Sequence, residues 1–256
     1  MKYLLSLSGG KDSTACLLWA LKTFNKEDIV AYYVDTKWEH DAVYEYLDYL
    51  EKELDIKIIR VESEGMMELS KRKKMMPNKL MRFCTENLKV IPAIEFYYEN
   101  FVSKNIDFIN IVGVRRDESE SRANTESFAI NSATYKKNKF DVKTLYPVAY
   151  WNTQRVFDYH KENKIDVNPL YKKGFSRVGC YPCIYARKHE IQAMEPFYVN
   201  RLRNLEKEIS SIVSKDGFNP KNAKFFDTER DKHLRQSLNF GEEYNNQCVN
   251  QFGICE

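Results

Sequence analysis

The sequence has 256 residues, enough for one large domain or for a core domain with an appendage. Its formal charge of +3 is close to balanced and does not by itself indicate a nucleic-acid partner. No apolar run reaches the roughly 18 residues of a membrane span, and the N-terminal segment MKYLLSLSGG is too short for a signal peptide. We therefore expect a cytoplasmic protein that does not cross a membrane. Its six cysteines are expected to serve metal binding or catalysis, not disulfides.

Short apolar runs alternate with helical patterns along the first half of the chain. The runs predict buried strands, and apolar residues at helical spacing predict helices packed on a sheet. In chain order we expect a strand at 4–7, a helix at 12–23, a strand at 29–34, a helix at 40–54, a strand at 56–61, a helix at 91–102 and a strand at 108–113. This alternation predicts an α/β fold with an open, mostly parallel sheet and helices on both faces.

The pattern changes after about residue 165. Residues 168–183 contain Pro169, Gly174, Gly179 and Pro182, which are typical of loops. A helical segment is expected at 189–214, and a polar, Asn-rich tail follows it. We therefore predict an α/β domain at 1–165 and a mainly helical and loop-like C-terminal extension at 166–256.

The segment SGGKDS, residues 8–13, joins the first predicted strand to the first predicted helix. In this position backbone N–H groups and the positive end of the helix dipole face a bound anion, and Lys11 adds a mobile cation. The spacing differs from a Walker A loop, which has four residues between its first glycine and its Gly-Lys pair. SGGKDS resembles the pyrophosphate-binding loop (PP-loop) of the N-type ATP pyrophosphatases. This resemblance implies a phosphate site formed by Ser8, Gly9, Gly10, Lys11, Asp12 and Ser13.

Three further segments resemble the phosphoadenosine phosphosulfate (PAPS) reductase family. They are RFCTENLKVIP at 82–92, GVRRDESESR at 113–122, and a long region at 146–183 that contains NPLY and ends in GCYPC. They occur in the order expected for the family, and with the loop they cover most of residues 1–185. RFCTENLK is also similar to the DNA phosphorothioation enzymes that activate sulfur. The resemblance implies a PP-loop, HUP-like nucleotide-binding fold at 1–165.

Polar residues at the ends of later strands are the other candidates for contacts with a nucleotide. The arginines of residues 113–122 lie near a strand end, where guanidinium groups pair with phosphate or sulfate oxygens. Acidic residues in the same segment leave a structural salt-bridge network as an alternative. Asp35 and Thr36 follow a strand that often meets ribose or adenine in nucleotide folds, and a simple helix-entry cap is the alternative for them. The predicted contacts beyond the loop are Asp35, Thr36, Gly113, Arg115, Arg116 and Arg122.

Two pairs of cysteines in the last third of the chain are candidate metal ligands. Cys180 and Cys183 form a C-x-x-C motif, and Cys248 and Cys255 lie near the end of the chain. Four thiolates could bind zinc or a 4Fe–4S cluster, and unpaired tail thiols are the alternative. Members of the resembled family often carry a cluster, and GC-x-PC is where two of its ligands fall. The adjacent Cys-Cys pair that supplies the other two is absent, so Cys84 or the C-terminal pair must complete a cluster.

Cys84 is also a candidate for chemistry. Its neighbours Arg82 and Lys89 could lower the pKa of the thiol and make it a sulfur carrier or a ligand. A buried structural thiol is the alternative. Cys16 lies in an apolar helix and is expected in the core, and His160 is interpreted as a surface or packing residue.

Three functions agree with these features. The first is an enzyme that binds ATP with Mg²⁺, cleaves it at the α–β phosphate by adenylating a substrate, and takes part in sulfur transfer or modification. Its candidate catalytic residues are Lys11, Cys84 and Arg116. The second is a thiol-dependent PAPS or APS reductase, although FGICE at 252–256 departs from the catalytic ECG segment of those reductases. The third is a non-enzymatic nucleotide- or nucleic-acid-binding module with a structural zinc. The expected partners are an adenine nucleotide and an unidentified sulfur donor or acceptor, with nucleic acid and a second copy of the chain as further candidates.

Overall fold

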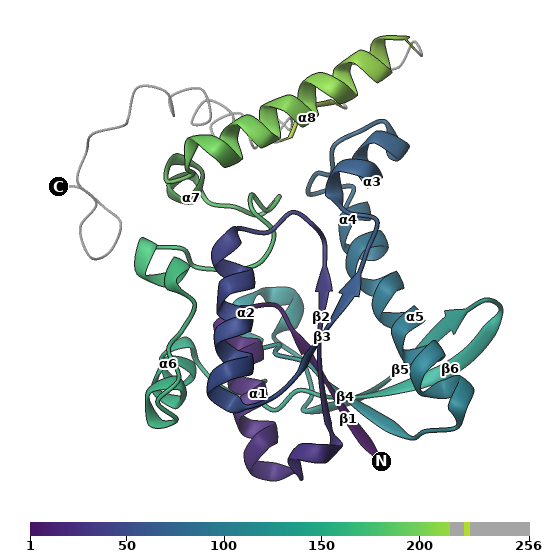
Figure 1. Cartoon of the computed structure of the whole chain (residues 1–256), viewed down its shortest axis with the longest axis vertical. Helices are drawn as coiled ribbons and strands as arrows, with labels where there is room; N and C mark the ends of the chain where they lie inside the picture. Colours follow the sequence, from purple (N-terminus) through teal and green to yellow (C-terminus); the bar gives the residue numbers. More distant parts are fainter. Residues whose placement is uncertain (216–222, 226–256) are drawn as a thin grey trace.

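The computed structural model describes residues 1–215 and 223–225. A six-stranded sheet forms its centre, in the order β3-β2-β1-β4-β6-β5 (Figure 1). The strands are β1 (Lys2–Leu7), β2 (Ile29–Asp35), β3 (Ile58–Glu62), β4 (Phe108–Ile111), β5 (Phe128–Tyr135) and β6 (Asn138–Leu145). All neighbouring strands are parallel except β5, which is antiparallel to β6. The predicted α/β fold with an open, mostly parallel sheet is therefore confirmed.

Helices follow most strands. They are α1 (Lys11–Thr23), α2 (Asp41–Leu54), α3 (Met66–Lys73), α4 (Phe83–Thr85), α5 (Ile91–Asn100), α6 (Thr153–Glu162), α7 (Lys188–Gln192) and α8 (Pro196–Lys215). Shorter helical turns are η1 (Lys26–Asp28), η2 (Glu86–Val90), η3 (Val102–Lys104), η4 (Arg116–Glu118), η5 (Glu120–Arg122) and η6 (Pro169–Lys173). Among the described residues, no helix is both long enough and apolar enough to pass through a bilayer.

The two faces of the sheet pack against different helices. Successive side chains of a strand point to opposite faces, so neighbouring residues of one strand enter different clusters. Leu5 and Tyr33 belong to the larger cluster, which includes apolar residues of α1 and α2. Leu4 and Tyr32 belong to the smaller cluster with residues of α5 and the β5–β6 hairpin. Because both faces are covered, strands β1 and β2 read as continuous apolar runs in the sequence.

The hairpin of β5 and β6 is not among the predicted elements. Most residues of β5, FAINSATY, are exposed, and β6, NKFDVKTL, shows only a short alternation in which Phe140, Val142 and Thr144 point inward. Lys136 and Lys137 of the basic run at 136–139 form the turn between them, with positive φ angles of 47° and 70°, and the rest of the run begins β6. The turn carries the charge to the surface, and the sheet gains two strands that the sequence pattern does not indicate.

The helix predicted at 189–214 is divided into α7 and α8. The break lies at 193–195, immediately before Pro196, which begins α8. The proline ring restricts the residue before it to extended conformations, so Glu195 cannot continue α7 into α8. The break turns the Glu195 carboxylate towards the body of the protein, where it accepts hydrogen bonds from Lys173 Nζ at 2.8 Å and from the Tyr181 hydroxyl at 3.0 Å.

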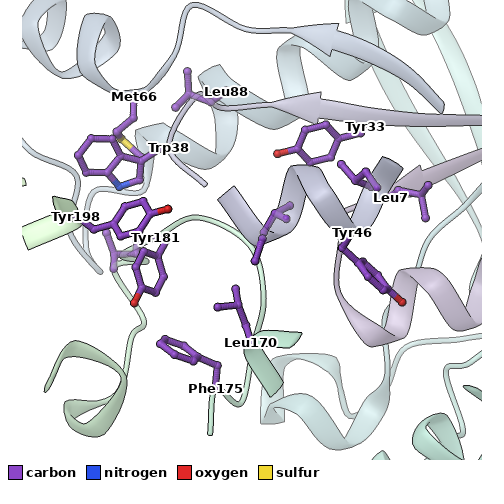
Figure 2. Packing of buried hydrophobic residues seen from close by; sticks show 14 of the residues in the cluster. Leu7, Tyr33, Trp38, Tyr46, Met66, Leu88, Leu170, Phe175, Tyr181 and Tyr198 are labelled. Carbon is purple, nitrogen blue, oxygen red and sulfur yellow. The ribbon is translucent and has the colours of Figure 1, made fainter. Parts of the chain in front are cut away.

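The segment after residue 165 packs onto the α/β core. Trp38 lies in a cluster with Met66, Tyr181 and Tyr198, which Figure 2 shows beside it. The indole N–H of Trp38 donates to the carbonyl of Pro182 at 3.2 Å, and the guanidinium of Arg201 stacks 4.2 Å above the indole ring. The predicted division at residue 165 therefore separates segments that share one hydrophobic core, and it stays a prediction about domains.

Gly113, just after β4, allows a test of how closely the chain there approaches α1. A Cβ at this position would lie 2.7 Å from the backbone of Asp12 and Ser13 in the first turn of α1. Gly113→Ala is expected to lower the free energy of unfolding by about 1–3 kcal/mol, because backbone cannot yield to the added carbon. Denaturant unfolding measures this loss. Gly179→Ala is the matched control, since no heavy atom lies within 4 Å of its added Cβ. Equal stability of the two variants would contradict the close approach of β4 and α1.

Candidate functional site

The loop at residues 8–10 joins β1 to α1 and presents the start of that helix to a pocket. Gly9 has a φ angle of +70°, and a Cβ there would lie 2.7 Å from Cγ1 of Val43, so the position requires glycine. Gly10 is the N-cap of α1 and has no side chain to occupy the first N–H groups of the helix. The Ser13 hydroxyl accepts from Ser8 N at 3.1 Å and donates to the Gly10 carbonyl at 3.0 Å. The loop is therefore ordered from within and directs positive helix-end charge at the pocket.

Three side chains from residues 160–171 hold the backbone of this loop from outside. The His160 Nε2 lies 2.9 Å from the carbonyl of Lys11 and donates to it. The Asn168 amide donates to the carbonyls of Gly9 and Ala42, both at 3.2 Å. The Tyr171 hydroxyl accepts from Lys11 N at 3.0 Å. We call His160, Asn168 and Tyr171 the loop clamp.

Burial strengthens the clamp. His160 and Asn168 are 1% and 0% exposed, so water does not replace a lost partner at either side chain. Burial is also the main cause of the lowered pKa of His160, which keeps the imidazole neutral. A neutral ring with its proton on Nε2 suits donation to the Lys11 carbonyl. The clamp thus fixes the conformation of the loop before any ligand arrives.

Asp12 shares its carboxylate between two buried cations. Its Oδ2 lies 3.1 Å from Lys11 Nζ, and its Oδ1 lies 2.5 Å from Arg115 Nε. Arg115 also contacts Asp117 and donates to the Trp151 carbonyl at 3.3 Å. The predicted salt-bridge alternative therefore describes Arg115 in this structure. Both oxygens of Asp12 face cations, so this side chain does not offer the free carboxylate that a nucleotide-bound Mg²⁺ would need.

A pocket of about 290 Å³ lies in front of the loop, at the carboxyl ends of β1 and β4. These two strands are neighbours in the sheet. From β1 the chain continues to β2 and β3 on one side of β1, and it then crosses to β4 on the other side. Ligands of open α/β sheets bind at such a switch point. Apolar lining comes from the C-terminal segment, including Leu170, Phe175 and Met194. The predicted site residues in its lining are Ser8, Gly10, Lys11, Asp12, Ser13, Gly113, Arg122, Cys180 and Cys183.

The three predicted arginines lie in different places. Arg122 lines the pocket and pairs with Glu118, which lines it as well. Arg115 lines an adjoining cavity, described below. Arg116 lines neither of these: its guanidinium stacks 4.0 Å from the Tyr150 ring and donates to the Thr125 carbonyl at 2.7 Å. A catalytic role of Arg116 stays a prediction that this geometry does not support.

Asp35 ends β2, Thr36 follows it, and both lie behind the pocket wall. Asp35 accepts from Lys37 N at 2.7 Å and from the Tyr44 hydroxyl at 2.9 Å, but His40 is the N-cap of α2, so Asp35 is not the helix-entry cap of the alternative. The Thr36 hydroxyl donates to Oε1 of Glu39 at 2.7 Å. Cys180 joins the same group, with its sulfur 3.8 Å from Glu39 Oε1. These contacts support the wall from behind, and contacts of Asp35 and Thr36 with a nucleotide stay a prediction.

Cys180 and Cys183 face the pocket and could take part in metal binding. Burial raises the pKa of the Cys180 thiol, the nearby Lys89 ammonium lowers it in part, and the Glu39 carboxylate raises it further. Within residues 1–215 and 223–225, no three or more His, Cys, Asp or Glu side chains are grouped to hold a metal ion. Cys248 and Cys255 lie outside the described residues. The described part of the chain therefore supplies two of the four thiols that a zinc site or a cluster would require.

Cys84 differs from its expected state. Burial raises the pKa of this thiol, and the Cys183 thiol adds to the shift, while Lys89 only partly offsets it. The expected activation by neighbouring cations is therefore wrong for this environment, because desolvation outweighs it. The guanidinium of Arg82 lies 5.1 Å from the ring of Tyr185. The alternative of a half-buried structural thiol agrees with the structure.

Several residues that shape the site were not predicted. Asn168 and Tyr171 belong to the NPLY segment, whose presence supports the family resemblance but whose contact with the loop cannot be read from spacing. His160 was interpreted as a surface or packing residue, and it is buried against the loop. Lys89 lines the pocket from the other side. The NPLY motif was the available signal for Asn168 and Tyr171, and nothing in the local sequence indicates the role of His160.

The clamp residue Asn168 offers a test of preorganisation. Asn168→Asp keeps the acceptor that receives Leu170 N at 3.0 Å but removes both donors to Gly9 and Ala42. The variant is expected to lose about 1–3 kcal/mol of unfolding free energy through the unsatisfied buried carbonyls. A buried carboxyl has a raised pKa, and its protonated form donates again, so the deficit should shrink as pH falls. Unfolding at several pH values measures this.

Asn131→Asp on the exposed hairpin is the control, where the single bond is to Thr144 at 3.3 Å. Its effect should stay within about 0.5 kcal/mol at every pH. A deficit of Asn168→Asp that does not depend on pH would contradict the donor role.

Much of the chain is similar to known proteins. Residues 2–186 match the sequence model of the phosphoadenosine phosphosulfate reductase domain. The phosphoadenosine 5'-phosphosulfate reductase of Buchnera aphidicola is 27% identical over 186 residues, which cover 69% of this chain and 68% of that protein. The structure of PAPS reductase from Candida auris, in a phosphate complex, has a TM-score of 0.52 at 15% identity and covers 72% of this chain and 83% of that chain. This last likeness concerns the fold.

A further relative is an uncharacterized protein of Methanocaldococcus jannaschii, 33% identical over 180 residues that cover 70% of this chain. The chain spans 35% of the length of that relative. The match to the family model includes the loop, the arginine segment and the C-x-x-C motif, all of which lie at the pocket or beside it. This chain therefore belongs to the phosphoadenosine phosphosulfate reductase family.

Proposed function

We propose that this protein binds ATP in the 290 Å³ pocket and cleaves it at the α–β phosphate, adenylating a substrate in a sulfur-transfer or modification reaction. One observation carries the proposal: the start of α1, which has no N-cap side chain, lies with Lys11 and the Gly9–Gly10 turn at one pocket, at the switch point of the sheet. Helix N-termini of this kind bind phosphate groups. The apolar lining from the C-terminal segment supplies the surface that a nucleoside requires.

The geometry suggests how the residues would act. A nucleophilic atom of the acceptor forms a bond to the α-phosphorus, the bond from that phosphorus to the bridging oxygen breaks, and pyrophosphate leaves with the electron pair. N–H groups of the first turn of α1 and the Lys11 ammonium stabilise charge on the leaving phosphates. Asp12 and Tyr171 hold Lys11 in place, through the 3.1 Å ion pair and the ring 5.1 Å from Nζ. Because the clamp orders the loop in advance, binding need not order it.

A second function has a specific observation in its favour. Cys180 and Cys183 line the same pocket as the phosphate loop, so a thiol chemistry or a metal site would act beside the bound nucleotide. The relative from Buchnera is a PAPS reductase, and a relative from Salinibacter ruber is an adenosine 5'-phosphosulfate reductase, 29% identical over 156 residues. In that alternative the nucleotide carries sulfate and the product is sulfite. The sequence FGICE, which differs from the catalytic ECG segment of those reductases and lies outside the described residues, counts against this alternative.

Lys11→Ala tests the proposed reaction. Pyrophosphate release from ATP is expected to fall by about 10²–10³-fold, because a preorganised cation at the leaving group is lost. The assay measures pyrophosphate from ATP and sulfite from PAPS with the same preparation. Lys172→Ala is the control: its side chain is exposed, it lies beside Tyr171 in the sequence, and it does not line the pocket. Native pyrophosphate release by Lys11→Ala, or sulfite release in its place, would overturn the ATP reaction.

The metal site has a separate test. We infer that Cys180, Cys183, Cys248 and Cys255 bind a 4Fe–4S cluster or zinc, and that Cys84 does not. Anaerobic purification followed by iron, sulfide and zinc analysis is expected to give one metal centre per chain in the native protein and in Cys84→Ser. Cys180→Ser and Cys255→Ser are expected to lose it. If Cys255→Ser keeps the metal and Cys84→Ser loses it, Cys84 and not the C-terminal pair completes the site. If the native protein contains no metal, the proposed metal site is wrong.

A further inference from the structure

A second cavity, of about 300 Å³, adjoins the nucleotide pocket. The two share a wall that is formed by Lys11, Glu118, Tyr171, Phe175 and Arg177. Beyond this wall the second cavity is lined by residues that the proposed reaction does not use, among them Arg187, Thr153 and Ser176. A molecule in the second cavity would therefore lie directly beside the phosphate end of a nucleotide in the first.

Positive charge dominates this cavity. The cations Lys11, Arg115, Arg177 and Arg187 line it, against the carboxylates of Asp117 and Glu118. Asp12 and Arg122 pair with lining residues, and the Glu190 carboxylate accepts from Ser176 and from Arg187 N, so counting all three leaves five cations against four carboxylates. Lys11 and Arg115 are compensated by Asp12 and Asp117. The excess charge belongs to the arginines farther along the chain.

Arg177 and Arg187 carry that excess. Arg177 lies 3.6 Å from Glu118, but Glu118 is already paired with Arg122, and the Arg177 side chain is 54% exposed. A long ion pair at such exposure contributes little. Within the described residues, Arg187 is in no ion pair, and its guanidinium remains able to bind an oxyanion. Arginine forks and the nearby Thr153 hydroxyl suit the oxygens of a phosphate, a sulfate or a carboxylate, while the Ser176 hydroxyl donates to Glu190 at 2.8 Å.

We propose that Arg177 and Arg187 form a second anion subsite, on the far side of Lys11 and Tyr171 from the nucleotide. Its ligand is a small, multiply charged oxyanion. The oxyanion is either the pyrophosphate part released from ATP or a phosphate- or sulfate-bearing second substrate. The proposal deepens the proposed function, on which it rests for the assignment of the nucleotide, but the anion site itself can be measured without it.

Arg187→Gln tests the subsite, since Arg187 lines only the second cavity of the two. Calorimetric titration of the full chain uses pyrophosphate, phosphate, sulfate and AMP as separate probes. Pyrophosphate affinity is expected to fall about tenfold or more in Arg187→Gln, while AMP affinity stays unchanged. Lys188→Gln is the matched control: it removes the neighbouring exposed cation, which does not line the cavity, and should leave all affinities unchanged.

The probes also separate the two sources of the anion. Pyrophosphate that binds at least about tenfold more tightly than phosphate and sulfate assigns the subsite to the leaving group. Similar affinities for all three assign it to a smaller anionic second substrate. Unchanged pyrophosphate affinity in Arg187→Gln, or an equal loss for AMP, would overturn the subsite. If pyrophosphate binds but neither ATP nor AMP does, the nucleotide function fails and the anion subsite stands.

Discussion

The site depends on the hydrogen bonds that the loop clamp makes to the backbone of residues 9–11. A glycine-rich turn is costly to order, because glycine loses more backbone freedom on folding than any other residue. Here Asn168 bridges the carbonyls of Gly9 and Ala42, and so ties the turn to the first turn of α2 as well. His160 and Tyr171 fix the carbonyl and the N–H of Lys11. These hydrogen bonds offset the conformational entropy lost on ordering the loop, so the loop already has its conformation before an anion binds.

The same contacts join two parts of the chain that differ in sequence character. The α/β core supplies the phosphate loop and the sheet edge, while the segment after residue 165 supplies Asn168, Tyr171, the apolar lining and both pocket thiols. Arg201 of α8 secures this arrangement through the carbonyls of Trp38 and Tyr181 and through the Trp38 ring. The pocket therefore exists only because the later segment folds back onto the strand ends.

Charge in the site is arranged in pairs, and the pairing decides which cations can bind a ligand. Asp12 takes up much of the charge of Lys11 and Arg115, which are both buried and could not remain unpaired without a large desolvation cost. The exposed arginines of the adjoining cavity carry no such cost. Arg115 therefore shapes the site from within, whereas Lys11, which also lines the nucleotide pocket, and the exposed arginines offer charge to a ligand. Burial acts in the same direction on Cys84 and Cys180, whose pKa values are raised in spite of a nearby ammonium group.

The amino-acid sequence by itself determined the fold class, the loop and the family. Buried parallel strands must be apolar on both faces, and a phosphate loop must carry its glycines and lysine at fixed positions, so both leave a local record. Tertiary structure alone decided which polar groups meet. His160 reaches Lys11 across 149 positions, and Arg115 reaches Asp12 across 103. The β5–β6 hairpin gave only a weak local signal, because most residues of β5 are exposed and the alternation in β6 is short. Contacts between distant residues are set by packing, and no local spacing encodes them.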